Sequence, residues 1–177
     1  MSEVVGDTSY LHNNTVPFSA VLTLTGASGC FSADLVTAVG FSHLLSARAS
    51  VNIVPGSLLC KVVGPASASK AATVIAAIVP VSKDNIYPET PEHVLTIGGH
   101  AFVQHSLYVT PVPTTIDFAP EVAHQLKPTP LVGLPPCIVG HYTLTGGTST
   151  DKSYFTLTGR LAVDGVGFAK SWATRAH

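Results

Sequence analysis

The sequence predicts an all-β protein of two packed sheets, and three observations support this prediction. The 177 residues include 22 Val, 19 Thr and 7 Ile, whose β-branched side chains lose rotamer freedom in helices and pack well on pleated sheets. Segments rich in these residues recur between Gly, Pro, Ser and Asn clusters, a rhythm typical of a sandwich or barrel. Helical spacing is confined to short stretches. The length suits one domain with one sizeable core.

Eight segments are predicted as strands. Residues 20–25 and 154–161 alternate apolar and polar side chains, so each strand is expected to have one buried and one exposed face. Residues 74–79 contain no polar side chain, which predicts burial on both faces, inside the sandwich or against a neighbouring subunit. The eight segments are residues 18–25, 33–39, 57–63, 73–79, 94–97, 101–109, 136–144 and 153–163.

Helices are expected to be short and few. Residues 40–48 carry apolar side chains at helical spacing, with Ser42 as a cap. A second short turn is expected at residues 121–126, after one proline and before another. Neither segment is long enough to organise the fold.

The connections between strands predict a single domain. Residues 67–69 and 146–150 are rich in Ser, Gly and Thr, and we expect exposed loops there. Prolines recur between residues 111 and 136, which predicts an extended, rigid surface crossover. Residues 1–15 have few apolar side chains to hold them to a core, so we expect a flexible N-terminal segment followed by one domain over residues 16–177.

The charge content predicts a protein that associates with itself. Only 11% of the residues are charged and 46% are hydrophobic, against roughly 25% charged in typical soluble domains. Such a chain has little polar surface for water, so we expect an obligate homo-oligomer. Residues 71–81 form the longest apolar run but fall short of the ~20 residues that a membrane span needs. No secretory signal precedes them, so we expect an intracellular chain with no membrane partner.

No residue pattern predicts an enzyme, a cofactor or a metal site. The sequence has no GxSxG elbow, no paired carboxylates and no complete dinucleotide-binding loop. Its eight histidines form neither an HxH nor an HExxH pattern. Cys30, Cys60 and Cys137 lack CxxC spacing, so we expect three reduced and mostly buried thiols, without disulfides or zinc.

Any contact with nucleic acid is expected to be weak for each subunit. The net charge is −1 and the first basic side chain is Arg48, so the chain lacks an arginine-rich N-terminal arm. The C-terminal region is mildly basic, and its single tryptophan offers a ring on which a base can stack. The candidate RNA-facing residues are Arg48, Arg160, Lys170, Trp172 and Arg175.

The order of several motifs resembles the coat proteins of tymoviruses and of relatives such as marafiviruses. The likeness covers most of the chain and begins at Pro17-Phe18-Ser19, where the family opens a strand. The more specific part is the strand ending in Ile78-Val79-Pro80, followed by Thr90-Pro91-Glu92 and then Gly98-Gly99-His100. Residues 138–144 and 155–161, around a Gly-Thr-Ser loop, resemble the last two strands of that family.

This resemblance implies a fold and a function. The fold would be an eight-stranded antiparallel jelly-roll β-sandwich with one or two short helices. The function would be structural, because these coat proteins assemble into an icosahedral, T=3-like shell that packages an RNA genome. It would place the chain in the virion, and in the host-cell cytoplasm during assembly, with residues 1–15 switching between subunit environments. Arg48 stands where the family pattern has a histidine, and Asp164 falls near another such position.

Histidines add an expectation of pH sensitivity. If His43, His100, His105 or His124 lie at subunit contacts, acidification would charge them and change shell stability or RNA release.

A different class of function stays open from the residues alone. A jelly-roll sandwich can also be a ligand-binding module of the lectin or cupin kind. Cupins need clustered metal-binding histidines, which the sequence does not show, and lectins display aromatic and acidic loop residues. The size of the particles that the protein forms would distinguish a shell from such a module.

Overall fold

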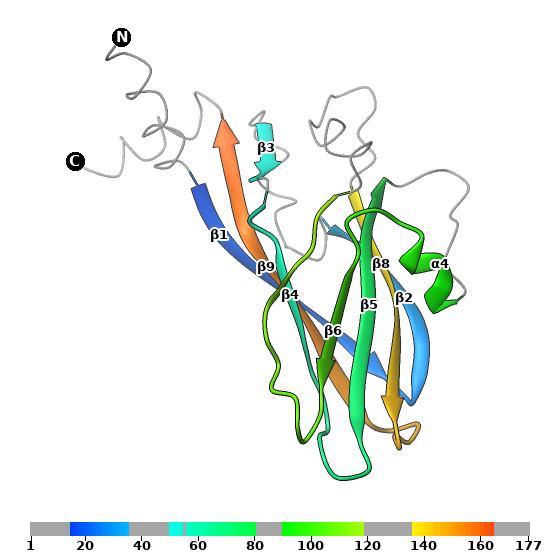
Figure 1. Ribbon diagram of the computed structural model, residues 1–177. Coiled ribbons are helices and arrows are strands. Elements are labelled where there is room, and N and C mark those ends of the chain that lie inside the picture. Colours follow the sequence, from blue (N-terminus) through cyan, green and yellow to red (C-terminus); the bar gives the residue numbers. More distant parts are fainter. Residues whose placement is uncertain (1–14, 36–49, 55, 81–89, 119–135, 165–177) are drawn as a thin grey trace, which may run out of the picture.

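The computed structural model describes residues 15–35, 50–54, 56–80, 90–118 and 136–164 (Figure 1). These parts of the chain form two antiparallel sheets that pack face to face, with one short helix against the outside of the second sheet (Figure 1). The arrangement confirms the predicted all-β sandwich.

The first sheet, called sheet A, has the strand order β1-β9-β4-β7, with β3 also paired to β9. Ile53 lies opposite Leu161 and Leu59 lies opposite Thr158, so β3 and β4 pair with successive parts of one edge of β9. The two short strands therefore fill a single position in a four-strand sheet. The strands of sheet A are β1 (Thr15–Thr25), β3 (Ser50–Ile53), β4 (Leu59–Val63), β7 (Thr114–Thr115) and β9 (Lys152–Asp164).

The second sheet, called sheet B, has the strand order β2-β8-β5-β6. Its strands are β2 (Ser28–Asp34), β5 (Ala71–Pro80), β6 (Ala101–His105) and β8 (Pro136–Thr145). The chain crosses repeatedly between the sheets, since β1, β4, β7 and β9 lie in sheet A while β2, β5, β6 and β8 lie in sheet B. Eight strand positions in two such sheets make the jelly roll that the resemblance implied.

The core lies between the sheets and is filled by the inward side chains of both. The rings of Phe31 on β2 and Phe155 on β9 meet across it, with centroids 5.6 Å apart. The Tyr142 hydroxyl on β8 donates a hydrogen bond to the Thr25 carbonyl at the end of β1, which ties the two sheets together at one end. The largest fully buried side chains are Phe155, Leu35, Leu58, Ile78, Ile116, Ile138 and Leu144.

Residues 94–97 are not a strand, and that prediction was wrong. Val94 lies in the helix α4 (Pro91–Leu95), which begins after Thr90 with a proline in its first turn. Proline is pre-shaped for that position because its fixed φ is helical and its missing N–H has no partner there. The helix ends where the Thr96 hydroxyl donates to the His93 carbonyl at 2.7 Å. The apolar run alone suggested a strand, but Pro91 at its start and Thr96 at its end favour a short helix.

The helix α4 covers part of the outer face of β5, where Ala77 is buried and Ile75 and Val79 are half-buried, so the predicted burial on both faces is confirmed only in part. Ala76 and Ile78 point into the main core, and Ala77 between them is also fully buried. Val94 of α4 packs on Ala77 and on Val139 of β8, forming a small second core outside sheet B. The cover over this part of β5 therefore comes from the same chain.

Several strand boundaries differ from the prediction. The strand β2 spans Ser28–Asp34, so it shares two residues with the strand expected at 33–39, of which residues 36–39 lie outside the described ranges. The strand expected at 101–109 ends at His105, because Ser106 closes a turn with Val109. The short strands β3 and β7 were not predicted, since two to four residues carry too little periodicity.

Several predictions fall on residues that the structure does not describe. These are the helix at 40–48, the turn at 121–126 and the flexible segment, of which residues 1–14 lie outside the described ranges. The exposed loops predicted at 67–69 and 146–150 are confirmed, and only Gly147 among them is partly buried.

Candidate assembly and RNA-facing surfaces

The connection between β6 and β7 exposes an apolar surface, called here the apolar loop (residues 107–112). Tyr108 is 86% exposed, Val112 64% and Leu107 56%. No Asp, Glu, Lys or Arg occurs between His105 and Asp117. Exposed aromatic and aliphatic side chains without charge are typical of the centres of protein interfaces. The apolar loop is therefore the described surface best suited to contact another protein.

Hydrogen bonds hold the apolar loop in a defined shape. The Ser106 hydroxyl accepts from the N–H groups of Tyr108 and Val109 at 3.3 and 3.1 Å. The Thr114 hydroxyl donates to the Val112 carbonyl at 3.3 Å. Because the loop is ordered before contact, its binding loses less conformational entropy than that of a floppy segment.

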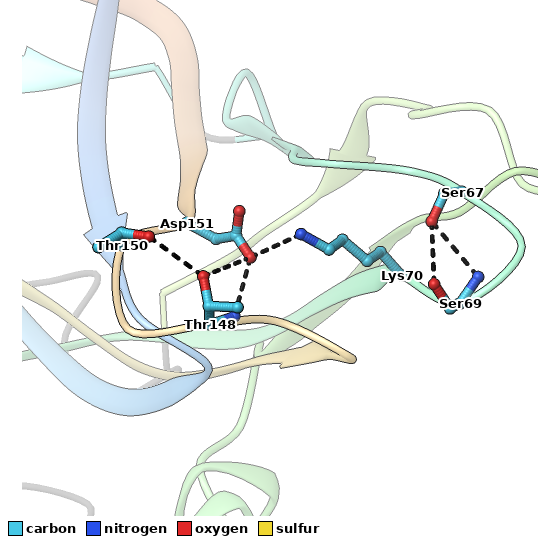
Figure 2. Close-up of polar contacts among 6 residues, drawn as sticks. All are labelled: Ser67, Ser69, Lys70, Thr148, Thr150 and Asp151. Atoms are coloured by element: carbon cyan, nitrogen blue, oxygen red, sulfur yellow. Dashed lines mark hydrogen bonds and ion pairs between the residues drawn. The ribbon is translucent and has the colours of Figure 1, made fainter.

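A polar clasp joins two loops at one end of the sandwich (Figure 2). Lys70, just before β5, donates to Asp151, just before β9, with Nζ and Oδ2 2.8 Å apart. The same oxygen accepts from the Thr148 N–H at 2.8 Å and from the Thr148 hydroxyl at 3.1 Å. On the other loop, the Ser67 hydroxyl accepts from the Ser69 N–H at 3.3 Å. The clasp thus fixes the β4–β5 and β8–β9 loops to each other.

The clasp depends on an ionised Asp151. The hydrogen bond from Lys70 and those from Thr148 favour the carboxylate, and they hold the pKa of Asp151 below its ordinary value. The group is solvent-accessible, so its contribution is screened by water and salt. Acidification below the usual range of an aspartate would weaken the clasp.

Two of the four candidate pH-sensitive histidines lie in the described residues, and they have different surroundings. His105, at the end of β6, accepts a hydrogen bond at Nδ1 from the Gly64 N–H, 3.1 Å away, and is half-buried. His100 is exposed, and its Nδ1 lies 2.8 Å from the Ile97 carbonyl. A proton on Nδ1 of His105 would remove its bond to Gly64. His43 and His124 lie outside the described residues.

Of the five candidate RNA-facing residues, the structure describes only Arg160. It lies on β9 with its side chain on the exposed face of sheet A, and its Nε donates to the Thr15 hydroxyl at 3.2 Å. Arg48, Lys170, Trp172 and Arg175 lie outside the described residues. The same face carries Lys61 and Lys152, which the sequence reasoning did not single out.

The cysteines differ from the prediction in one respect. All three are free thiols, as expected, but only Cys60 is buried. Cys30 is exposed because its position on β2 points away from the core, while its neighbours Gly29 and Phe31 turn inward. Burial raises the pKa of the Cys60 thiol to about 12. Cys137 is half-buried.

Among the described residues there is neither a cluster of metal ligands nor a membrane-crossing helix. No group of three or more His, Cys, Asp or Glu side chains there could hold a metal ion. Within the same residues, no helix has the length and apolar character needed to cross a membrane.

Comparison with solved structures identifies the fold. A chain of desmodium yellow mottle tymovirus is 13% identical with a TM-score of 0.57, over 83% of this chain and 78% of that one. A chain of turnip yellow mosaic virus is 16% identical with a TM-score of 0.55, over 85% and 92%. A chain of cocksfoot mottle virus is 10% identical with a TM-score of 0.51, over 86% and 84%.

No family model matches the chain, and no curated protein resembles it in sequence. The solved structures share its fold at low identity, so the likeness shows that this chain has the jelly-roll fold of these virus chains.

Proposed function

We propose that the chain is a viral coat protein whose function is to assemble with copies of itself into a closed shell around an RNA genome. The observation that carries this proposal is the ordered apolar loop, which a protein with few charges exposes on a jelly-roll framework. Tyr108 is 86% exposed, so it contributes nothing to the core. Its ring is suited to a contact with another subunit.

Two further features support a structural role. The ion pair between Lys70 and Asp151 stiffens two loops at one end of the sandwich, which suits a subunit that must keep its shape under contact. The tymovirus-like fold supports a shell of T=3 type, located in the virion and assembled in the host-cell cytoplasm. Residues 1–15 would switch between subunit environments in such a shell.

Electron microscopy of the purified chain tests the proposal, with ultraviolet absorbance of the same sample to detect nucleic acid. Uniform spherical particles are expected. Only monomers or small oligomers, across several salt and pH conditions, would contradict a shell and favour a ligand-binding module.

A matched pair of variants tests the part assigned to the apolar loop. Tyr108→Ser is expected to raise the protein concentration needed for assembly about tenfold or more, as the loss of an interface anchor does. Val21→Ser removes a side chain that is also exposed, 56%, but on sheet A, and should leave assembly unchanged. Circular dichroism should show both variants folded. Equal effects of the two substitutions on assembly would show that the apolar loop does not lie at the interface.

A further inference from the structure

The outer face of sheet A carries three positively charged side chains. It consists of the outward side chains of β1, β9 and β4, which alternate with buried ones. Lys61, Lys152 and Arg160 lie on it, and residues 15–25, 59–63 and 152–162 of these strands include no Asp or Glu. The only ion pair among the described residues, Lys70 with Asp151, lies in the loops beyond the sheet edge. Three cations thus share this part of the face without an acidic partner on it.

Strand register sets the spacing of these cations. Lys152 and Arg160 are on β9, and Lys61 of β4 lies opposite Thr156, midway between them. Four residues of an extended strand cover about 13 Å, so the positive charges follow one another at about that interval along the sheet. They form a line along β9 rather than a compact pocket. A line of separated cations matches an extended polyanion better than a small anion.

The side chains between the cations suit the rest of a nucleotide chain. Tyr154 is 44% exposed on β9 and lies between Thr23 of β1 and Val63 of β4. An exposed aromatic ring flanked by cations is the arrangement with which proteins stack bases while neutralising phosphates. Hydroxyl groups that can donate to phosphate oxygens fill other outward positions of β1: Ser19, Thr23 and Thr25.

We propose that the outer face of sheet A binds single-stranded RNA, with Lys61, Lys152 and Arg160 on the phosphates and Tyr154 stacked on a base. This inference rests on the proposed function, because it assigns the RNA of the coat protein to a particular face. The binding is independent of base sequence, since every contact is to phosphate or to the flat side of a base.

The test compares the unpaired lysines of the face with a paired lysine outside it. Lys61→Gln with Lys152→Gln removes two unpaired cations, and Lys70→Gln removes the cation already paired to Asp151. Binding of a fluorescent single-stranded RNA to the full-length protein is followed by anisotropy at several salt concentrations. The double variant should bind more weakly for all RNA sequences. The slope of log K against log salt should shrink by about 0.7 for each phosphate that is no longer neutralised.

Lys70→Gln should leave both the affinity and the slope unchanged. Tyr154→Leu keeps an apolar side chain but removes the stacking surface, so it should weaken binding about fivefold or more without changing the slope. Unchanged affinity and slope in the double variant would overturn the proposal. A double variant that alters particle formation but not the slope would also overturn it, because the face would then be covered by another subunit.

The outcomes separate this inference from the proposed function. If the protein forms shells and the double variant binds RNA like the wild type, the coat function is supported. The outer face of sheet A is then not the RNA-binding face. If the protein never forms shells but the double variant binds RNA more weakly and with less salt dependence, the RNA face is supported and the coat function is contradicted.

Discussion

The outer faces of the two sheets differ in what covers them. On sheet B, α4 packs Val94 on Ala77 and Val139, so part of that face is closed by the chain itself. On sheet A, the described residues place no element over the outer face, which carries Lys61 and Lys152 among hydroxyl side chains. Two faces built from the same kind of strand thus have opposite roles. One completes the core of the subunit, and the other is available to a partner.

The largest expected effect comes from placing the same charge on both faces. Val94→Asp puts a carboxylate into the sealed contact under α4 and should cost about 3–5 kcal/mol of stability, as an unpaired buried charge does. Val21→Asp, on sheet A, replaces a side chain that is 56% exposed and should cost about 1 kcal/mol or less, the range of strand propensities. Urea unfolding followed by circular dichroism measures both. Similar losses would contradict the difference between the faces.

A smaller loss is expected within sheet B, where the ring of Phe31 lies over Gly140 on the neighbouring strand. A Cβ at Gly140 of β8 would overlap the ring of Phe31 and come within 2.6 Å of the Ile75 carbonyl. Gly140→Ala should therefore cost about 1–3 kcal/mol, because both neighbours are held by the core and the sheet. Gly56→Ala serves as a comparison for the added methyl group, since nothing lies within 4 Å there, although its φ of +72° adds backbone strain. A neutral Gly140→Ala would show that Phe31 can move away from β8 at little cost.

The contribution of the clasp to stability should be detectable only as a dependence of the thermal midpoint on pH. The folded-state pKa of Asp151 is lowered, so its stabilisation is present above the unfolded pKa of about 3.9 and is lost as the pH falls through the folded value. The thermal midpoint of the wild type should therefore drop more steeply below about pH 4 than that of Asp151→Asn. Parallel curves for the two proteins would show that the clasp adds no stability.

Thiol labelling compares an exposed cysteine of sheet B with a buried cysteine of sheet A without any substitution that alters stability. Cys30, exposed on sheet B away from α4, should react first with an alkylating reagent at neutral pH. Cys60 should react only on unfolding, because it is buried and its pKa is about 12. Mass spectrometry of timed samples gives the order in which the thiols react. The Cys30→Ser variant identifies the fast site. Early modification of Cys60 would mean that the core opens readily.

The sequence predicted the sandwich well because its signal is repeated along every long strand. Alternation along 154–161 placed Phe155 and Leu157 inward correctly, and the unbroken apolar run at 74–79 predicted burial of both faces of β5, which is confirmed in part. It failed at 94–97, where apolar side chains fit a strand or a helix equally and Pro91 decides the outcome.

The candidate RNA face was harder to predict, because it depends on pairing between distant strands. Arg160 was chosen for its place in a mildly basic C-terminal region. Lys61 comes to lie beside β9 only because β4 pairs with that strand, nearly a hundred residues later in the chain. The signal for Lys152 and Tyr154 was present, since both share the outward phase of β9 with Arg160.

The most direct test of the difference between the faces is ultraviolet cross-linking of single-stranded RNA to the purified protein, with the modified residues located by mass spectrometry. Tyr154 on sheet A should be cross-linked. Phe102, 52% exposed on sheet B, and Tyr108 in the apolar loop provide aromatic rings of equal or greater exposure as internal controls. RNA attached at Phe102 or Tyr108, with none at Tyr154, would contradict the account.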